Sequence, residues 1–443
     1  MRRPWPLLVC LFLLSLPAVT PRLYSSDEVQ YFAYLRSLWF DHDLSFDNEY
    51  RHFYDNGVAR NAGFHETFLE RATDTGRRIN FGTLGCAILW APFYAAGDAI
   101  ARASGAPVDG YSKPYIAAVA YGSACYGFIA VLLGVASARR LGFDARLAAL
   151  LVWVGTPLLF YMYVAPPFSH ACSAFAVGLF VAVWLRVRRE WSASGLLVLG
   201  ACAALMAMVR EQDAFFAAGP ALDYAIDLFR GRARLLPAAA GLGAGLAAYA
   251  PQLLAYVRIN GHIGPHASVA HKMSWSAPHA LQVLFSPQHG LFLWTPIALL
   301  AIAGLIALAC DPRHRRIALC LLLMTALQVY VGGSVESWTV AGGFGQRRFV
   351  ALTVILIIGL AAGWARLQTA PTGVRRAAIA ATVLAAYWNL AVSAEFAIGL
   401  MDRQRLEPQK NAYAAFVTIP AEAPSLAYRY LFDRRSFYAS GAR

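Results

Sequence analysis

The sequence predicts an all-α protein that crosses a membrane many times. Only 14% of its 443 residues are charged and 58% are hydrophobic, whereas about a quarter of the residues in a soluble protein are charged. The hydrophobic residues also stand in long unbroken blocks, as membrane-spanning helices require. Finally, basic residues cluster in the short connections between these blocks, which is typical of cytoplasmic loops.

The first apolar block runs from Pro6 to Thr20, after Arg2 and Arg3. It lacks a good cleavage site, so we predict an uncleaved span with a cytoplasmic N-terminus. Ten further blocks bring the predicted bundle to about eleven transmembrane helices: 114–138, 147–165, 169–187, 193–210, 213–229, 235–257, 291–310, 317–335, 347–365 and 377–398.

One apolar stretch, Phe81 to Ala103, does not fit this alternation, because counting it as a span would place the later arginine-rich loops outside. We therefore predict a re-entrant or interfacial helix on the outer side. The result is a single membrane domain, 1–443, in the cell (inner) membrane of a bacterium. Its extracytoplasmic parts are a first loop at 21–112 with juxtamembrane helices, a second long loop at 258–290, and a C-terminal tail at 399–443.

The net charge of +13 does not indicate nucleic-acid binding, because the arginines follow the membrane topology. The seven cysteines lie in or beside apolar segments without metal-ligand spacing, so we expect small buried hydrophobes and no disulfide. In this topology nine of the ten histidines and most other polar groups fall on the outer side. Any active site is therefore expected there.

The first outer loop opens with two adjacent carboxylates, Asp27 and Glu28, on an aromatic-lined amphipathic segment. Acidic groups at a membrane surface are costly and often functional. Either can accept a proton from a hydroxyl group or contact a divalent cation. The alternative is a helix N-cap, which needs only one of them. Asp41 and Asp43 are weaker metal candidates, since such residues also populate turns.

Three further outer segments carry candidate residues. His170 begins a span after two prolines, although a lone histidine is more often structural. Arg210 and Asp213 interrupt an apolar run, where they either line a cavity or pair with each other. Arg347 and Arg348 lie on the outer side against the positive-inside rule, which suits a bound phosphate. Pairing of these arginines with Glu336 or lipid headgroups is the alternative.

The order of these motifs resembles bacterial membrane glycosyltransferases of the GT-C superfamily, related to protein O-mannosyltransferases and aminoarabinose transferases. The resemblance covers nearly the whole chain. It rests on the carboxylates in the first loop and on four later segments: Gly82 to Phe93, Pro167 to Ala171, Phe285 to Pro296, and Phe344 to Phe349.

The resemblance implies a GT-C-like helical bundle that moves a sugar from a polyprenyl-phosphate donor to a lipid-linked, glycan or protein acceptor on the outer face. It implies that Asp27 is the catalytic base or a metal contact, with Glu28 as second choice and His170 as ligand or proton shuttle. A divalent cation, Mg²⁺ or Mn²⁺, at Asp27 and His170 stays open. The other expected roles are phosphate binding and substrate contact: Arg347, Arg348, Gln346 and Arg210 for the donor phosphate, and Tyr31, His289 and Trp338 for substrate.

Two functions of other classes remain as alternatives. A lipid-linked sugar flippase or transporter needs polar groups through the membrane midplane, often with internal repeats. Here the polar groups gather on one face and no repeat is evident. A noncatalytic cell-envelope assembly subunit would keep its function after loss of Asp27 and Arg347.

Overall fold

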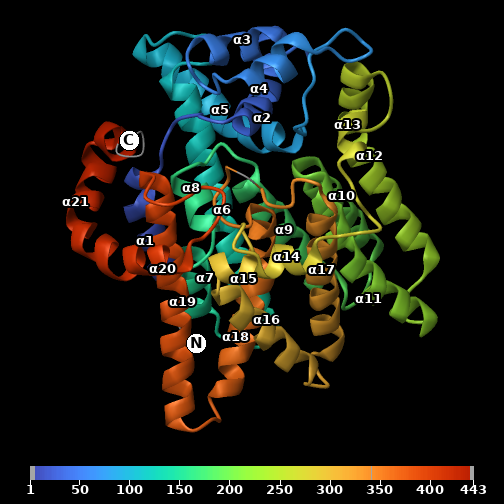
Figure 1. The fold of residues 1–443 in the computed structure, drawn as a ribbon. Helices are drawn as coiled ribbons and strands as arrows, with labels where there is room; N and C mark the ends of the chain where they lie inside the picture. The colour runs from blue at the N-terminus through green and yellow to red at the C-terminus, as the bar shows by residue number, and fades with distance from the viewer. Residues whose placement is uncertain (1–4, 341, 440–443) are drawn as a thin grey trace.

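The computed structural model describes residues 5–340 and 342–439, and in these residues it contains helices and two isolated β-bridges but no strand (Figure 1). Six of the described helices are long and apolar enough to cross a membrane. They are α6 (Lys113–Arg140), α9 (His170–Val187), α12 (Leu235–Asn260), α17 (Arg315–Ser334), α18 (Thr353–Leu367, continuing the turn η5 at Arg347–Leu352) and α19 (Thr372–Ile398). Three shorter apolar helices join them: α1 (Trp5–Ser15, extended by η1 at Leu16–Ala18), α10 (Ala193–Val209) and α16 (Ile297–Ala309).

The predicted all-helical membrane bundle is confirmed, but several of the eleven predicted spans are not single α-helices. The block 147–165 forms α7 (Arg146–Val154) and α8 (Leu158–Tyr163). The break is at Pro157, which cannot donate a backbone hydrogen bond. The block 213–229 begins in the 3₁₀ turn η4 (Glu211–Ala217) before α11 (Ala218–Phe229).

The first outer loop folds into a cap above the bundle, shown in blue and cyan in Figure 1. It comprises α2 (Ser26–Arg36), η2 (Ser37–Asp41), α3 (Asp47–Asp55), α4 (Ala62–Phe64), η3 (His65–Glu70) and α5 (Gly85–Ser104). Its core is aromatic: Phe32 packs edge-on against Phe53 and Tyr94, and Tyr34 against Phe46. Short helices are only marginally stable by themselves, and these aromatic contacts stabilise them by packing.

Most of the stretch 81–103 lies in one continuous helix, α5, which begins at Gly85 and runs unbroken through Pro92. A proline early in a helix can be tolerated where a neighbouring helix covers the bend. Helix α5 begins against the end of α10, because a Cβ on Gly85 would lie 2.4 Å from the backbone of Met208. It ends in the cap, where the hydroxyl of Tyr94 donates to the carbonyl of Gly110.

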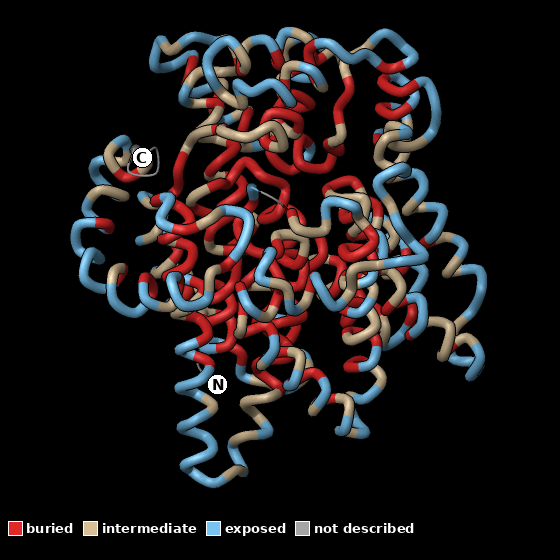
Figure 2. The backbone as a smooth tube through the Cα atoms, in the orientation of Figure 1, coloured by how far each residue is buried: buried red, intermediate tan, exposed pale blue. Residues whose placement is uncertain are grey.

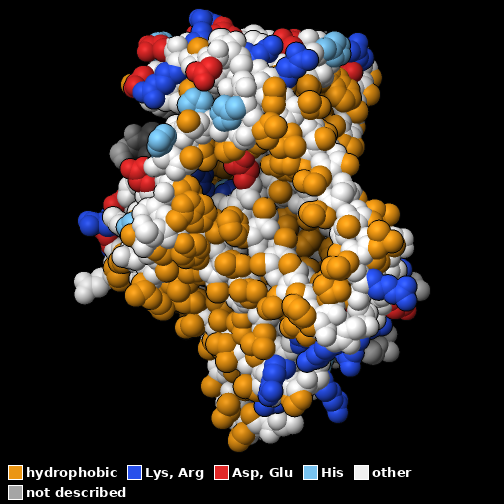
Figure 3. Space-filling model, turned by 90° about the vertical axis from the view of Figure 1, so that its right-hand side faces the viewer, with side chains coloured by type: hydrophobic (Ala, Val, Ile, Leu, Met, Phe, Trp, Pro, Cys, Tyr) orange, Lys and Arg blue, Asp and Glu red, His pale blue; other side chains and the backbone are white. Residues whose placement is uncertain are grey.

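Arginine-rich connections gather at the end of the bundle opposite the cap (Figure 3). At that end the guanidinium of Arg316 pairs with Asp223 and Asp227, and Asp223 also binds Arg188 at 2.7 Å. The start of α1 lies there too, since Leu7 and Leu8 share a cleft with Arg146. The predicted grouping of basic loops on one side is therefore seen in the fold.

The remaining segments lie around the cap end of the bundle. Residues 258–290 contain α13 (Ala267–His271) and α14 (Ala280–Phe285), followed by α15 (Leu291–Trp294). The C-terminal segment forms α20 (Pro408–Tyr413), η6 (Ala414–Thr418), α21 (Ile419–Phe432) and α22 (Arg434–Ala439). Figure 2 shows burial concentrated in the centre of the bundle, while α12, the far end of α19 and α21 are largely exposed.

Candidate functional site

A polar cavity of about 200 Å³ lies where the cap meets the bundle. Five separate parts of the chain supply its walls: α2, the segment before α5, the start of α9, the arginine after α10, and the two arginines before α18. Its lining residues are Asp27, Gln30, Tyr31, Phe81, Gly82, Phe168, Ser169, His170, Arg210, Arg347 and Arg348. Six of the ten candidate residues from the sequence are therefore brought together here.

Asp27 lies in the first turn of α2 and reaches the cavity. Its Oδ2 forms an ion pair with Arg347 Nη1 at 2.9 Å, and its side chain is 41% exposed. The carboxylate lies at the positive end of the helix dipole, where an acidic side chain stabilises the helix. Because other residues cap the helix, this carboxylate is available to a substrate hydroxyl.

Glu28 caps helix α2 together with Ser25, and it does not line the cavity. Its Oε2 accepts hydrogen bonds from the backbone N–H groups of Tyr24 and Ser25, and Ser25 accepts in return from the N–H of Glu28. This is a capping box. Burial raises the pKa of the Glu28 carboxyl to about 8. The N-cap alternative thus applies to Glu28, while Asp27 is left for chemistry.

The exchange Glu28→Gln is expected to keep transfer within about threefold of the wild type, because glutamine also completes a capping box. The pKa of Glu28 is higher in the folded protein than in the unfolded chain, so the unfolded chain ionises first as the pH rises. The free energy of unfolding therefore falls between about pH 5 and pH 8. The glutamine variant should lose this decline. Thermal unfolding in detergent across that pH range measures it, and a variant with the wild-type pH slope would contradict the assignment.

Arg210 binds the residues at the start of α9. Its Nη1 donates to His170 Nδ1 at 2.8 Å and to Ser169 Oγ at 3.2 Å. His170 must therefore be unprotonated at Nδ1, because a guanidinium can only donate. Arg348 is held on the other wall, where its Nη1 donates to the carbonyl of Ser337 at 3.0 Å. Three guanidinium groups thus share the cavity with one carboxylate, so the lining carries an excess of positive charge.

The cavity does not fit a divalent cation. In the described residues no three His, Cys, Asp or Glu side chains are grouped as metal ligands require. Asp27 already pairs with Arg347, and His170 directs Nδ1 at Arg210. The surrounding guanidinium groups also repel a cation.

The weaker metal candidates are structural. Asp41 pairs with Arg36 and accepts a hydrogen bond from Asn48, while Asp43 accepts from Ser37 and from the backbone of Ser45. These contacts close the turn between η2 and α3.

Besides Glu28, three predicted site residues lie outside the cavity lining. The amide of Gln346 donates to the carbonyl of Trp338 at 3.0 Å and so fastens the loop before η5. The Trp338 ring stacks on His279, with centroids 5.4 Å apart. His289 is fully buried and stacks on Trp294. Each is occupied in packing the loops that carry Arg347 and Arg348.

Sequence reasoning missed Gln30, which shapes the floor of the cavity. Its side-chain oxygen accepts from the backbone N–H of Phe81 at 2.8 Å, and its carbonyl accepts from Asn80 at 3.0 Å. These bonds hold Gly82 beside Tyr31, where a Cβ would lie 3.3 Å from the tyrosine ring. A glutamine on an amphipathic helix carries no distinguishing signal in the sequence.

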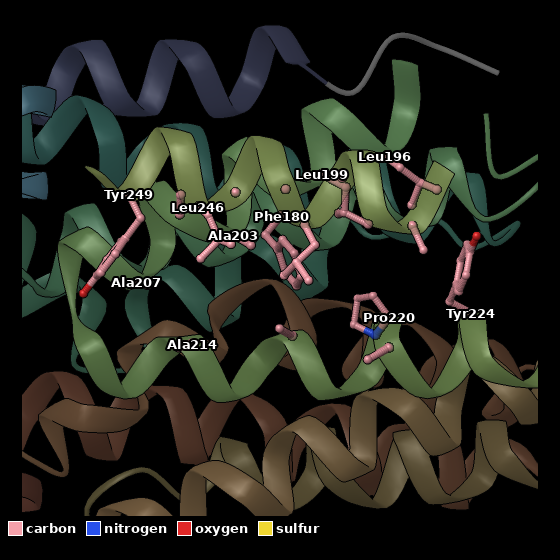
Figure 4. A pocket seen from close by; sticks show the side chains of 18 of the residues that line it. Phe180, Leu196, Leu199, Ala203, Ala207, Ala214, Pro220, Tyr224, Leu246 and Tyr249 are labelled. Carbon is pink, nitrogen blue, oxygen red and sulfur yellow. The ribbon is translucent and has the colours of Figure 1, made fainter. Parts of the chain in front are cut away.

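Two larger spaces connect to the polar cavity. A cleft of about 540 Å³ under residues 265–275 shares Tyr31, Phe81, Arg210 and Arg348 with it and adds Glu211. Glu211 also ends an apolar groove of about 730 Å³ between α10, α11 and α12. Figure 4 shows this groove, with Leu199, Phe180, Leu246, Pro220 and Tyr249 among its walls. The shared residues place the groove next to the cleft and the cleft next to the arginines of the polar cavity.

A solved structure shares this fold. The crystal structure of ArnT from Cupriavidus metallidurans bound to undecaprenyl phosphate matches with a TM-score of 0.58 and 16% sequence identity, over 98% of this chain and 73% of that chain. ArnT is an aminoarabinose transferase of the GT-C superfamily. The GT-C-like fold expected from the sequence is confirmed. No protein-family model and no curated protein sequence matches the chain.

Proposed function

We propose that this protein is a membrane glycosyltransferase that moves a sugar from a polyprenyl-phosphate donor to an acceptor on the outer face of the membrane, with its N-terminus in the cytoplasm. The observation that carries the proposal is the pairing of a single accessible carboxylate, Asp27, with three arginines in one cavity. Its connection to an apolar groove suits a substrate that is anionic at one end and a hydrocarbon at the other. ArnT, which shares the fold, was crystallised with such a lipid.

The donor is proposed to bind with its phosphate at Arg210 and Arg348 and its prenyl chain along the groove of α10 and α12. Both arginines lie in the cavity and in the adjoining cleft, so they stand between the apolar space and Asp27. Guanidinium groups bind phosphate oxygens with two parallel hydrogen bonds. Glu211, held by the hydroxyl of Tyr256, stands at the passage from groove to cleft.

In the proposed reaction the acceptor hydroxyl lies against Asp27 Oδ. The carboxylate takes the hydroxyl proton while the acceptor oxygen bonds to the anomeric carbon. The bond between that carbon and the phosphate oxygen breaks, and its electron pair stays on the phosphate. Arg210 and Arg348 stabilise the charge that develops on the leaving group, and Arg347 fixes the position of Asp27.

The fold offers less support for a transporter. The polar cavity lies at the cap end of the bundle, whereas the buried acids Asp223 and Asp227 near the opposite end are bonded to Arg188 and Arg316. Transport of a polar sugar needs polar groups between these two regions.

A donor panel tests the proposal. Purified protein is given radiolabelled polyprenyl-phosphate sugars, or the matching nucleotide sugars, together with a lipid extract from the native membrane. We expect label in the extract with at least one polyprenyl-phosphate sugar and none with its nucleotide counterpart. Transfer from the nucleotide sugar, or from no donor in the panel, would contradict the proposal.

Chelation is expected to leave the reaction unchanged. Because arginines occupy the positions around Asp27 where a metal would bind, we propose that the leaving phosphate is stabilised by guanidinium groups alone. Transfer should therefore stay within about twofold of its initial rate in excess EDTA. A loss that Mg²⁺ or Mn²⁺ restores would show that a divalent cation takes part.

A further inference from the structure

The C-terminal segment, α20 to α22, stands beside the bundle as an arm that is attached at two places (Figure 1). At one, the hydroxyl of Tyr387 on α19 donates to the carbonyl of Ala415. At the other, the hydroxyl of Tyr430 donates to Ala18 at 2.8 Å, and Arg434 Nη1 donates to the carbonyl of Val19 at 2.6 Å. Helix α21 runs between these attachments.

A second apolar cleft, of about 550 Å³, lies between the arm and the bundle. It is separate from the groove of α10 and α12, with which it shares no lining residue. The bundle side is formed by α1, α7, α8 and α19, and small side chains of α21, Ala423 and Ala427, line the other side. The cleft is long, apolar and bounded by helices, as a site for a hydrocarbon chain must be.

The outer face of the arm is also apolar. Tyr413, Tyr428 and Phe432 are 65%, 63% and 75% exposed. Exposed aromatic side chains on a short helix, beside arginines such as Arg435, are typical of helices that lie in the membrane interface. The outer face of the arm therefore suits contact with lipid, while its inner face lines the apolar cleft.

One arginine, Arg22, lies beside one end of this cleft without lining it. Tyr430 and Phe437 line the cleft, and the hydroxyls of Tyr430 and Tyr438 both lie 3.3 Å from Thr20 Oγ1. The Arg22 guanidinium stacks on the Tyr438 ring at 3.5 Å, and its Nε is buried without a hydrogen-bond partner. A buried guanidinium nitrogen without an acceptor is costly, and an anionic oxygen would satisfy it.

This end of the cleft adjoins the wall of the polar cavity. Arg22 lies 5.2 Å from the ring centroid of Tyr24, and Tyr24 packs edge-on against Phe168. Phe168 lines the cavity on the side of Arg347, whose guanidinium carbon lies 5.3 Å from its ring. Arg22 therefore lies next to this wall of the cavity, with the Tyr24 and Phe168 rings between it and Arg347.

We infer that the cleft under the arm holds the hydrocarbon chain of a lipid-linked acceptor, whose phosphate binds at Arg22. The inference rests on the proposed transferase function and adds the class of its acceptor: a lipid with a phosphate or diphosphate between its chain and its sugar. Two apolar clefts with separate basic ends then bring donor and acceptor to Asp27 from different sides.

Photolabelling in proteoliposomes tests the inference without any need for catalysis. The probe is decaprenyl diphosphate with a diazirine in its chain, compared with decaprenol and phosphatidylcholine carrying the same group. We expect the diphosphate probe to label peptides of α19 and α21, and Arg22→Gln to reduce this labelling about tenfold, since a charge-assisted hydrogen bond is lost.

Two tryptophan variants provide the matched pair. Ala423→Trp fills the cleft and should remove most of the labelling, whereas Ala421→Trp, about 200° around the same helix and not in the cleft lining, should leave it unchanged. Equal labelling by all three probes, or equal loss in both variants, would overturn the inference and leave bulk lipid in the cleft. Asp27→Asn should label like the wild type, so failure of binding and failure of transfer are distinguished.

Discussion

Replacing Asp27 by Asn should lower the rate of sugar transfer about a thousandfold, the usual contribution of a positioned general base. The amide keeps the size of the side chain but cannot take the acceptor proton. It also loses the ion pair with Arg347 at 2.9 Å. Initial rates with saturating donor measure the effect, and thermal unfolding confirms that the variant is folded.

The neighbouring exchange Glu28→Gln is the control for this result, because it alters a carboxylate one position away that caps α2 instead of facing the cavity. A large loss in both variants would indicate damage to α2. Full activity of Asp27→Asn would remove Asp27 from the mechanism.

Replacing Arg348 by Gln should lower kcat/KM for the donor about a hundredfold, because a guanidinium that meets the leaving phosphate acts mainly in the transition state. Arg348 is chosen over Arg347 because it lies in both the cavity and the adjoining cleft, and over Arg210 because Arg210 also holds Ser169 and His170. Arg348→Lys should recover part of the loss, since it keeps the charge but not the paired hydrogen bonds.

The matched control is Arg315→Gln, an exposed arginine at the opposite end of the bundle that donates to the carbonyl of Ala309. It should leave donor kinetics unchanged. If Arg348→Gln behaves like this control, the donor phosphate binds elsewhere.

The hydrophobic blocks predict the fold class because a helix that crosses a membrane needs a long run of apolar residues, which is visible in the sequence. The number of continuous helices is less predictable, since Pro157 breaks one block while Pro92 lies inside the unbroken α5. Whether a proline ends a helix depends on what packs around the bend. That information belongs to the tertiary structure.

Much of the candidate site also follows from sequence, because charged residues in an apolar chain stand out. Asp27, His170, Arg210 and Arg348 are distant in sequence and line one cavity. The sequence does not show which of the two adjacent carboxylates, Asp27 or Glu28, caps the helix, and the capping geometry in the structure assigns that role to Glu28.

The ring contacts of His289 with Trp294 and of Trp338 with His279 depend on loop packing, which the sequence does not show, and the assignment of both residues to substrate stays a prediction. The groove that ends at Glu211 consists mostly of alanine and leucine, whose pattern is the same in any packed membrane helix.

The most direct test of the account follows both products in proteoliposomes that contain purified protein, a lipid extract, and a polyprenyl-phosphate sugar labelled in its sugar. The account predicts that labelled acceptor lipid and free polyprenyl phosphate appear in equal amounts with the wild type, and that neither appears with Asp27→Asn. Movement of intact donor between the leaflets without either product would contradict it and favour a transporter.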